Sequence, residues 1–134
     1  MTPVFTEKAP KPVGPYSQAL LVDGFLFLSG QIGLDPESGK LKEGFREQVE
    51  QVFKNIEAIL ESVGAGKRHI VRVVVYLKDL SLFKEFNQLY ENFLREVKVK
   101  PVRTTLQVSE LPLGALLEVE VTAFLGKTHD TLRP

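Results

Sequence analysis

The segment Ile70–Leu77, which reads Ile-Val-Arg-Val-Val-Val-Tyr-Leu, constrains the fold of this chain more than any other. Branched side chains pack well on a pleated surface, so such a run is typical of a strand in the interior of a sheet. Segments with helical periodicity stand on both sides of it. We therefore expect a fold of helices and strands in which this strand lies inside the sheet.

Two segments repeat apolar residues at three- and four-residue spacing, which is the pattern of one buried helical face. The first, 45–63, is followed by glycines that are expected to end it. The second begins near Asp79 or Ser81, either of which could cap a helix. Its apolar pattern continues until Lys100-Pro101, the expected end of the helix.

Short apolar runs separated by turn residues predict the other strands. Two of these runs are joined by Asp23-Gly24, a pair that favours a type I′ turn, and they predict a β-hairpin. The expected ranges are 16–22, 25–29, 104–108 and 116–124, with an additional N-terminal strand at 3–5. The sheet would therefore contain five or six strands.

Two helices can cover only one face of such a sheet. In the last predicted strand neither set of alternating side chains is simply polar: Leu117, Val119, Val121 and Ala123 form one set, and Leu116, Glu118, Glu120, Thr122 and Phe124 form the other. A sheet that is apolar on both faces predicts that the bare face is buried against other copies of the chain. We expect a homo-oligomer, in which sites can lie between subunits.

Length and charge restrict the kind of partner. With 134 residues, 43% of them hydrophobic, the chain fits a single domain over residues 1–134. Seventeen basic residues balance seventeen acidic ones, so no overall field attracts nucleic acid or anionic lipid. No segment has the apolar core of a signal peptide or the length of a membrane span, and a cytoplasmic location is expected by default. The expected partner is a small molecule or another protein.

Few residues have the types and spacing of a catalytic constellation. The chain contains no cysteine, which excludes disulfides, cysteine-based zinc sites and thiol nucleophiles. His69 and His129 are far apart and lack ligand spacing, so neither a metal site nor a catalytic histidine pair is expected. The glycines at 30–33 and 64–66 are interpreted as turn residues rather than a phosphate-binding loop, and no cofactor is indicated.

Arg103 is the strongest single candidate for a binding residue. It stands at the start of a predicted strand, behind Pro101, where a stiff backbone can hold a guanidinium ready for a carboxylate. A solvated cation at the end of a strand is the alternative interpretation.

Four further features contain polar residues at unusual positions. Tyr16 opens a strand after a stiff Pro-Val-Gly-Pro segment, and Ser29-Gly30 closes the hairpin. Asn87 interrupts the second helix beside its apolar face, where asparagine is a poor helix former. Glu118 lies within an otherwise aliphatic strand. Each feature by itself has an ordinary structural explanation.

Six motifs taken together resemble the Rid family of YjgF-type reactive-imine deaminases over residues 8–124. They are Gly-Pro-Tyr-Ser-Gln-Ala at 14–19, Ser-Gly-Gln-Ile at 29–32, Val-Tyr-Leu-Lys-Asp-Leu at 75–80, Phe-Asn-Gln-Leu-Tyr at 86–90, Pro-Val-Arg-Thr-Thr at 101–105 and Leu-Pro-Leu-Gly-Ala-Leu-Leu-Glu-Val-Glu at 111–120. The motifs follow the family's order and spacing, so chance is a poor explanation for the match.

The resemblance implies a chorismate-mutase-like α+β fold, assembled as a homotrimer with clefts between subunits. In the family, the arginine that matches Arg103 holds the substrate carboxylate, in agreement with the interpretation above. The other positions that match cleft residues are Tyr16, Ser29, Gly30, Asn87, Thr105 and Glu118. Asn87 is expected to support the cleft rather than take part in the reaction. At Thr105 many members have a cysteine, and the threonine excludes a thiolate mechanism for this chain.

The implied activity is hydrolysis of 2-iminobutanoate or 2-iminopropanoate, reactive products of pyridoxal-phosphate dehydratases, to 2-oxo acids and ammonia. A protonated imine is already electrophilic, so the reaction needs no metal or cofactor. Arg103 would anchor the carboxylate, Glu118 would activate water or relay protons, and backbone groups of Thr105 would align the imine. Tyr16 and Ser29 would shape and polarise the pocket.

Two alternatives remain open at this point. One is a non-catalytic regulatory trimer that binds small carboxylates, as relatives without the arginine suggest, although this chain has both Arg103 and Glu118. The other is RNA cleavage or translation inhibition, which is also ascribed to family members. Neutral net charge and the absence of a histidine pair disfavour the RNA-directed activity.

Overall fold

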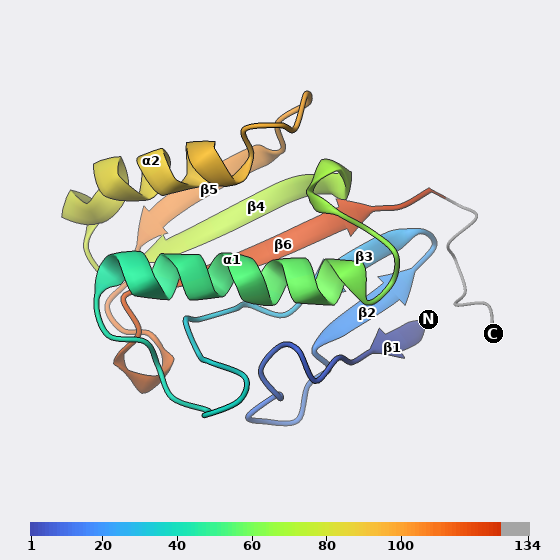
Figure 1. Cartoon of the computed structure of the whole chain (residues 1–134), viewed down its shortest axis with the longest axis horizontal. Coiled ribbons are helices and arrows are strands. Elements are labelled where there is room, and N and C mark those ends of the chain that lie inside the picture. The colour runs from blue at the N-terminus through green and yellow to red at the C-terminus, as the bar shows by residue number, and fades with distance from the viewer. Residues whose placement is uncertain (127–134) are drawn as a thin grey trace.

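The computed structural model describes residues 1–126, which form a six-stranded sheet with two α-helices on one face (Figure 1). The elements are β1 (Thr2–Val4), β2 (Ala19–Val22), β3 (Phe25–Leu28), α1 (Phe45–Glu61), β4 (Ile70–Leu77), α2 (Phe83–Phe93), β5 (Val102–Gln107) and β6 (Leu117–Phe124). The strand order is β1-β2-β3-β6-β4-β5, and every neighbouring pair is antiparallel except β4 with β5. The predicted mixed sheet with two helices on one face is confirmed, and the strand at 70–77 lies inside the sheet.

The hairpin of β2 and β3 forms as the sequence predicts. Asp23 and Gly24 have φ angles of 49° and 81°, and a type I′ turn requires positive φ at both positions. Strand β2 begins at Ala19 rather than at residue 16, because the chain turns before it. In that turn the N–H of Tyr16 donates to the carbonyl of Gly14 at 2.9 Å. Tyr16 therefore lies in a loop outside the sheet.

The second helix is shorter than its apolar pattern predicts. It ends at Phe93 instead of continuing to Lys100, yet Leu94 and Val97 are buried in the turns that follow. The ammonium of Lys100 donates to the carbonyls of Leu94 and Val97, each at 2.6 Å. Lys67 donates to the carbonyl of Phe93 at 2.8 Å. The lysines satisfy carbonyls that a further helical turn would otherwise have used.

The edge strand β5 begins two residues earlier than the sequence predicts. Its parallel pairing with β4 starts at Val102, which lies opposite Arg72. Arg103 is therefore a strand residue, paired with Val73, and its direction is set by the pleat rather than by a flexible strand end.

The two faces of the sheet have different surroundings. The buried face of β4 and β6, which packs against the helices, carries Val73, Val75, Leu77, Leu117, Val119, Val121 and Ala123. The opposite face carries Phe25, Phe27 and Phe124, all exposed in the single chain. Their rings lie together, with centroids 4.7 Å apart for Phe25 and Phe124 and 6.0 Å apart for Phe25 and Phe27. Figure 1 shows both helices on the same side, so we call this second side the bare face.

Buried amide side chains of α1 hold two loops that approach the sheet. Asn55 is fully buried, and its amide nitrogen lies 3.3 and 3.0 Å from the carbonyl oxygens of Ile32 and Leu34. The side-chain oxygen of Gln48 accepts the N–H of Leu116 at 2.9 Å, directly before β6. One helix thereby fixes both segments relative to the sheet.

The two histidines have no place in a candidate site of the described residues. His69 ends a 3₁₀ turn, Lys67–His69, and its Nδ1 accepts the N–H of Gly66 at 3.0 Å. His129 lies outside the described residues. Within residues 1–126 no helix is long and apolar enough to cross a membrane, and no group of three or more His, Asp or Glu side chains is placed to hold a metal ion.

Replacing Asn55 with Ala should lower the free energy of unfolding by about 2 kcal/mol, because the carbonyl of Leu34 loses its Asn55 donor and the carbonyl of Ile32 keeps only the N–H of Leu34. Urea unfolding followed by circular dichroism measures the change. The exposed neighbour provides the control, and Lys54→Ala should alter stability by no more than about 0.5 kcal/mol. Equal stability of the two variants would show that the loop carbonyls do not depend on Asn55.

Candidate functional site

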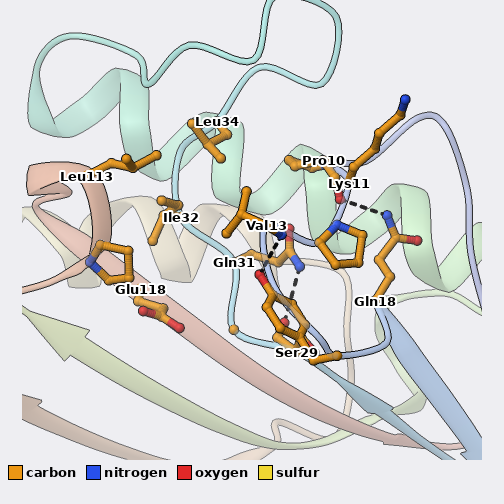
Figure 2. Close-up of a pocket in the computed structure, with 14 residues that line it drawn as sticks. Pro10, Lys11, Val13, Gln18, Ser29, Gln31, Ile32, Leu34, Leu113 and Glu118 are labelled. Carbon is orange, nitrogen blue, oxygen red and sulfur yellow. Dashed lines mark hydrogen bonds between the residues drawn. The ribbon is translucent and has the colours of Figure 1, made fainter.

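A pocket opens where the loop before β2, the loop after β3 and the start of β6 meet (Figure 2). Four of the residues that the sequence singles out line it, and we call them the glutamate pocket: Tyr16, Ser29, Gly30 and Glu118. Apolar side chains complete the walls, among them Val13, Ile32, Leu34 and Leu113. The pocket therefore combines a carboxylate and hydroxyl groups with an apolar surround.

Glu118 is half-buried on the bare face of β6. Gly30 lies directly against it, and a Cβ atom at position 30 would overlap the Glu118 carboxylate, so only glycine allows this approach. Burial, reinforced by the negative charge of Glu120, raises the pKa of the Glu118 carboxyl. A carboxyl with a raised pKa can exchange protons closer to neutral pH than an ordinary glutamate can.

Hydrogen bonds fix the segment that contains Ser29 and Gly30. The Ser29 hydroxyl donates to the carbonyl of Ser17 at 2.6 Å. Gln31 and Val119 exchange two backbone hydrogen bonds of 2.8 and 3.0 Å, which tie the segment to β6. Hydrogen bonds of both neighbours, Ser29 and Gln31, thus hold Gly30 in its position against Glu118.

The N-terminal loop of the pocket is held by Gln18, a residue that the sequence analysis missed. Its buried amide donates to the carbonyls of Thr6 and Pro10 at 3.1 and 3.0 Å and accepts the N–H of Thr6 at 2.8 Å. A glutamine within the predicted strand 16–22 was the signal that could have found it. In the same loop the hydroxyl of Tyr16 accepts the N–H of Val13 at 3.2 Å, which orients the phenol.

Arg103, Thr105 and Asn87 belong to β5 and α2, and we call these three residues the arginine patch. Arg103 and Thr105 lie on the helix-facing side of β5, and Asn87 lies on α2. The guanidinium carbon of Arg103 is 4.8, 5.5 and 5.7 Å from the ring centroids of three aromatic side chains of α2. Within residues 1–126 no carboxylate forms an ion pair with Arg103. Its charge is therefore available to a ligand.

Three buried side-chain oxygens in residues 1–126 have no hydrogen-bond partner: Asn87 Oδ1, the Tyr90 hydroxyl and Thr105 Oγ1. Such atoms are rare in folded proteins, because an unsatisfied buried polar group costs free energy. All three belong to α2 or β5, the elements that carry the arginine patch. The patch thus contains polar atoms that the chain itself does not use.

The glutamate pocket and the arginine patch lie on opposite faces of the sheet in one chain. Arg103 pairs with Val73 of β4, whose side chain faces the helices. Glu118 pairs with Tyr76 of β4, three residues later, whose side chain faces the bare side. One chain therefore brings the seven predicted site residues together as two separate groups rather than as one site.

The two groups can offer different interactions to a ligand. The arginine patch offers a guanidinium with a geometry that matches a carboxylate. The glutamate pocket offers a carboxyl whose pKa is raised towards the range of a general acid or base.

The chain is similar to known proteins over nearly all of its length. The family model described as Endoribonuclease L-PSP matches residues 6–125. A RutC family protein of Aquifex aeolicus is 56% identical over 92% of this chain and 98% of its own length. The 2-iminobutanoate/2-iminopropanoate deaminase of Homo sapiens is 40% identical over 92% of this chain and 89% of its own length. The crystal structure of RidA from an Antarctic Psychrobacter superposes with a TM-score of 0.89 at 41% identity, over 92% of this chain and 99% of that one.

Replacing Glu120 with Gln should lower the pKa of Glu118, because the charge of Glu120 is one of the two causes that raise it. Titration of the side-chain carboxyl by ¹³C NMR measures the change. The Glu118 carboxyl should then ionise at lower pH than in the wild type, whereas Glu91→Gln on α2 should leave it unchanged. A Glu118 pKa that does not fall in Glu120→Gln would show that burial alone raises it.

Proposed function

Since this chain belongs to the Endoribonuclease L-PSP family, the family of the YjgF, RutC and Rid proteins, we propose that it is a 2-iminobutanoate/2-iminopropanoate deaminase. The observation that carries the proposal is the pair of complementary groups, an unpaired arginine in one and a glutamate of raised pKa in the other. The relative of that name in Homo sapiens supports the choice of substrate.

The proposed reaction is the addition of water to the C=N bond of a 2-imino acid. Arg103 binds the carboxylate through two parallel N–H donors and so orients the imine carbon. Glu118 accepts a proton from the attacking water as the C–O bond forms. Glu118 then returns this proton to the nitrogen. The C–N bond breaks as the hydroxyl oxygen forms the new C=O and releases its proton to solvent, and a 2-oxo acid and ammonia leave. Every step is proton transfer and addition or elimination, so no oxidant is required.

The other residues of the two groups have supporting roles in this proposal. Backbone groups of Thr105 align the imine, and its side chain takes no part as a nucleophile. Tyr16 and Ser29 shape the pocket. The Tyr16 hydroxyl is oriented by a hydrogen bond within its own loop, and the Ser29 hydroxyl by a hydrogen bond to the carbonyl of Ser17 in the loop before β2. Asn87 supports the cleft from α2.

We further propose that the site forms between copies of the chain in a homotrimer. The two groups lie on opposite faces of one sheet, so a complete site needs the glutamate pocket of one copy and the arginine patch of another. The aromatic cluster of Phe25, Phe27 and Phe124 on the bare face supports assembly, because exposed apolar patches of this kind mark interfaces.

The description of the family model supports endoribonuclease activity as a second candidate. Binding to RNA depends on lysine and arginine contacts with phosphates, and this chain has a net charge of zero. Salt-dependent RNA binding with cleavage would favour the second candidate over the first.

Trapping of freshly formed imine tests the proposal directly. An amino-acid oxidase or a dehydratase generates 2-iminobutanoate in situ, and semicarbazide captures the imine that remains. The protein should lower the captured fraction and release ammonia catalytically. Binding of 2-oxobutanoate without turnover would instead indicate the non-catalytic carboxylate-binding protein.

Arg103→Ala should reduce kcat/KM for the imine by about 100-fold or more, because charge-assisted hydrogen bonds to the carboxylate are lost. Arg103→Lys should also be strongly impaired, since an ammonium cannot present two parallel donors. Circular dichroism of each variant checks that the fold is retained. Near-wild-type turnover in a folded Arg103→Ala would contradict the role of Arg103.

Mixing two inactive variants tests whether the site lies between copies. Arg103→Ala and Glu118→Gln chains are unfolded together in equal amounts and refolded. A site works where an intact Arg103 of one copy meets an intact Glu118 of another, so about a quarter of the sites should recover by random assembly.

Each variant refolded alone provides the control, and both must be inactive and must form the same oligomer as the wild type. A mixture that stays inactive would show that the two residues act within one chain or in different sites.

A further inference from the structure

We propose that Tyr90, together with Phe83 and Phe86, positions the Arg103 guanidinium and keeps it uncompensated for a carboxylate ligand. We call the three rings the aromatic cage. This inference rests on the proposed function, because it concerns how the arginine of that site is prepared for its ligand.

Contacts between α2 and β5 define the cage. The guanidinium carbon of Arg103 lies 4.8 Å from the centroid of the Tyr90 ring, 5.5 Å from that of Phe83 and 5.7 Å from that of Phe86. The three residues are three and four positions apart on α2, which places their rings on one side of the helix. The centroids of Phe86 and Tyr90 are 5.5 Å apart, so the rings also support each other.

Aromatic rings hold a guanidinium in a different way from carboxylates. A ring attracts the cation through its negative face, whereas a carboxylate takes the N–H donors at the edge of the guanidinium. Within residues 1–126 Arg103 has no ion pair. The cage thus restricts the side chain while its donors and its charge remain available. Restricting a flexible side chain in advance lowers the entropy cost of binding a ligand.

The Tyr90 ring, rather than its hydroxyl, carries this role. The hydroxyl is buried without a hydrogen-bond partner, so it does not anchor the ring to another group in the chain. Burial raises the pKa of Tyr90, and the nearby charge of Arg103 opposes the rise, which agrees with the close approach of the two side chains. A phenylalanine can therefore replace the tyrosine in the cage.

Two substitutions of Tyr90 separate the ring from the hydroxyl. Tyr90→Leu should raise KM for 2-iminobutanoate by about tenfold and leave kcat within about twofold, because ligand binding loses a preorganised partner. Tyr90→Phe should restore KM most of the way to the wild-type value.

Phe93→Leu is the matched control for the loss of a ring. Phe93 lies on the same helix and stacks on Phe53 with centroids 4.1 Å apart, but it is not among the rings that contact Arg103. The control should alter stability and leave KM unchanged. Equal KM values for Tyr90→Leu and Phe93→Leu would overturn the inference.

An internal carboxylate provides a second, independent test. Phe83 is 38% exposed and lies in the first turn of α2, where a glutamate is compatible with the helix dipole. In Phe83→Glu the new carboxylate can pair with Arg103 and compete with the ligand. Its KM should therefore be about tenfold higher than that of Phe83→Gln, in which an uncharged side chain of the same shape as glutamate replaces the ring. Equal KM values in the two variants would overturn the inference.

Binding of 2-oxobutanoate, measured by calorimetry on the same variants, separates failure of the cage from failure of the proposed function. If the wild type binds 2-oxobutanoate but does not hydrolyse the imine, the deaminase assignment fails, and weaker binding in Tyr90→Leu still supports the cage. If the wild type is active and neither KM nor Kd changes in Tyr90→Leu and Phe83→Glu, the cage alone is overturned. A wild type that neither hydrolyses nor binds overturns both.

Discussion

Successive side chains of a β-strand point to opposite faces of the sheet, and this alternation decides on which face each candidate site residue lies. Arg103 faces the helices and Glu118 faces the bare side, although their strands both pair with β4. No change of rotamer brings the two groups together, because the hydrogen-bonded sheet lies between them. A site that uses both must draw on two copies of the chain, and the exposed aromatic cluster of the bare face is suited to that contact.

Polar residues in the interior hold the pocket in place. Asn55 and Gln18 bind loop carbonyls that no strand or helix would satisfy. These bonds fix the two loops that bring Tyr16 and Ser29 to the mouth of the pocket. The absence of a side chain on Gly30 then leaves room for the Glu118 carboxylate. Stability and site geometry thus depend on the same buried amides.

The surroundings of the two charged groups of the proposed site, Glu118 and Arg103, act on them in opposite ways. Glu118 is half-buried beside a second carboxylate, so its charged form is disfavoured and its pKa rises. Arg103 lies against aromatic rings, which hold it without neutralising it. Neither group forms an ion pair within residues 1–126. Both therefore keep their capacity to interact with a ligand or with another copy of the chain.

The sequence by itself determined the helices, the strands and the hairpin, because their signals are local: helical spacing at 45–63, a β-branched run at 70–77, and the Asp23-Gly24 pair. It also indicated the candidate site residues through motifs. Only the tertiary structure decided which of them meet. It also decided that α2 ends at Phe93, where Lys67 and Lys100 donate hydrogen bonds to the carbonyls at and after the helix end. The rings around Arg103 likewise had no sequence signal, and the buried role of Gln18 was indicated only by a polar residue within a predicted strand. Contacts between distant residues leave no periodic pattern in the chain, so they appear only when the elements pack together.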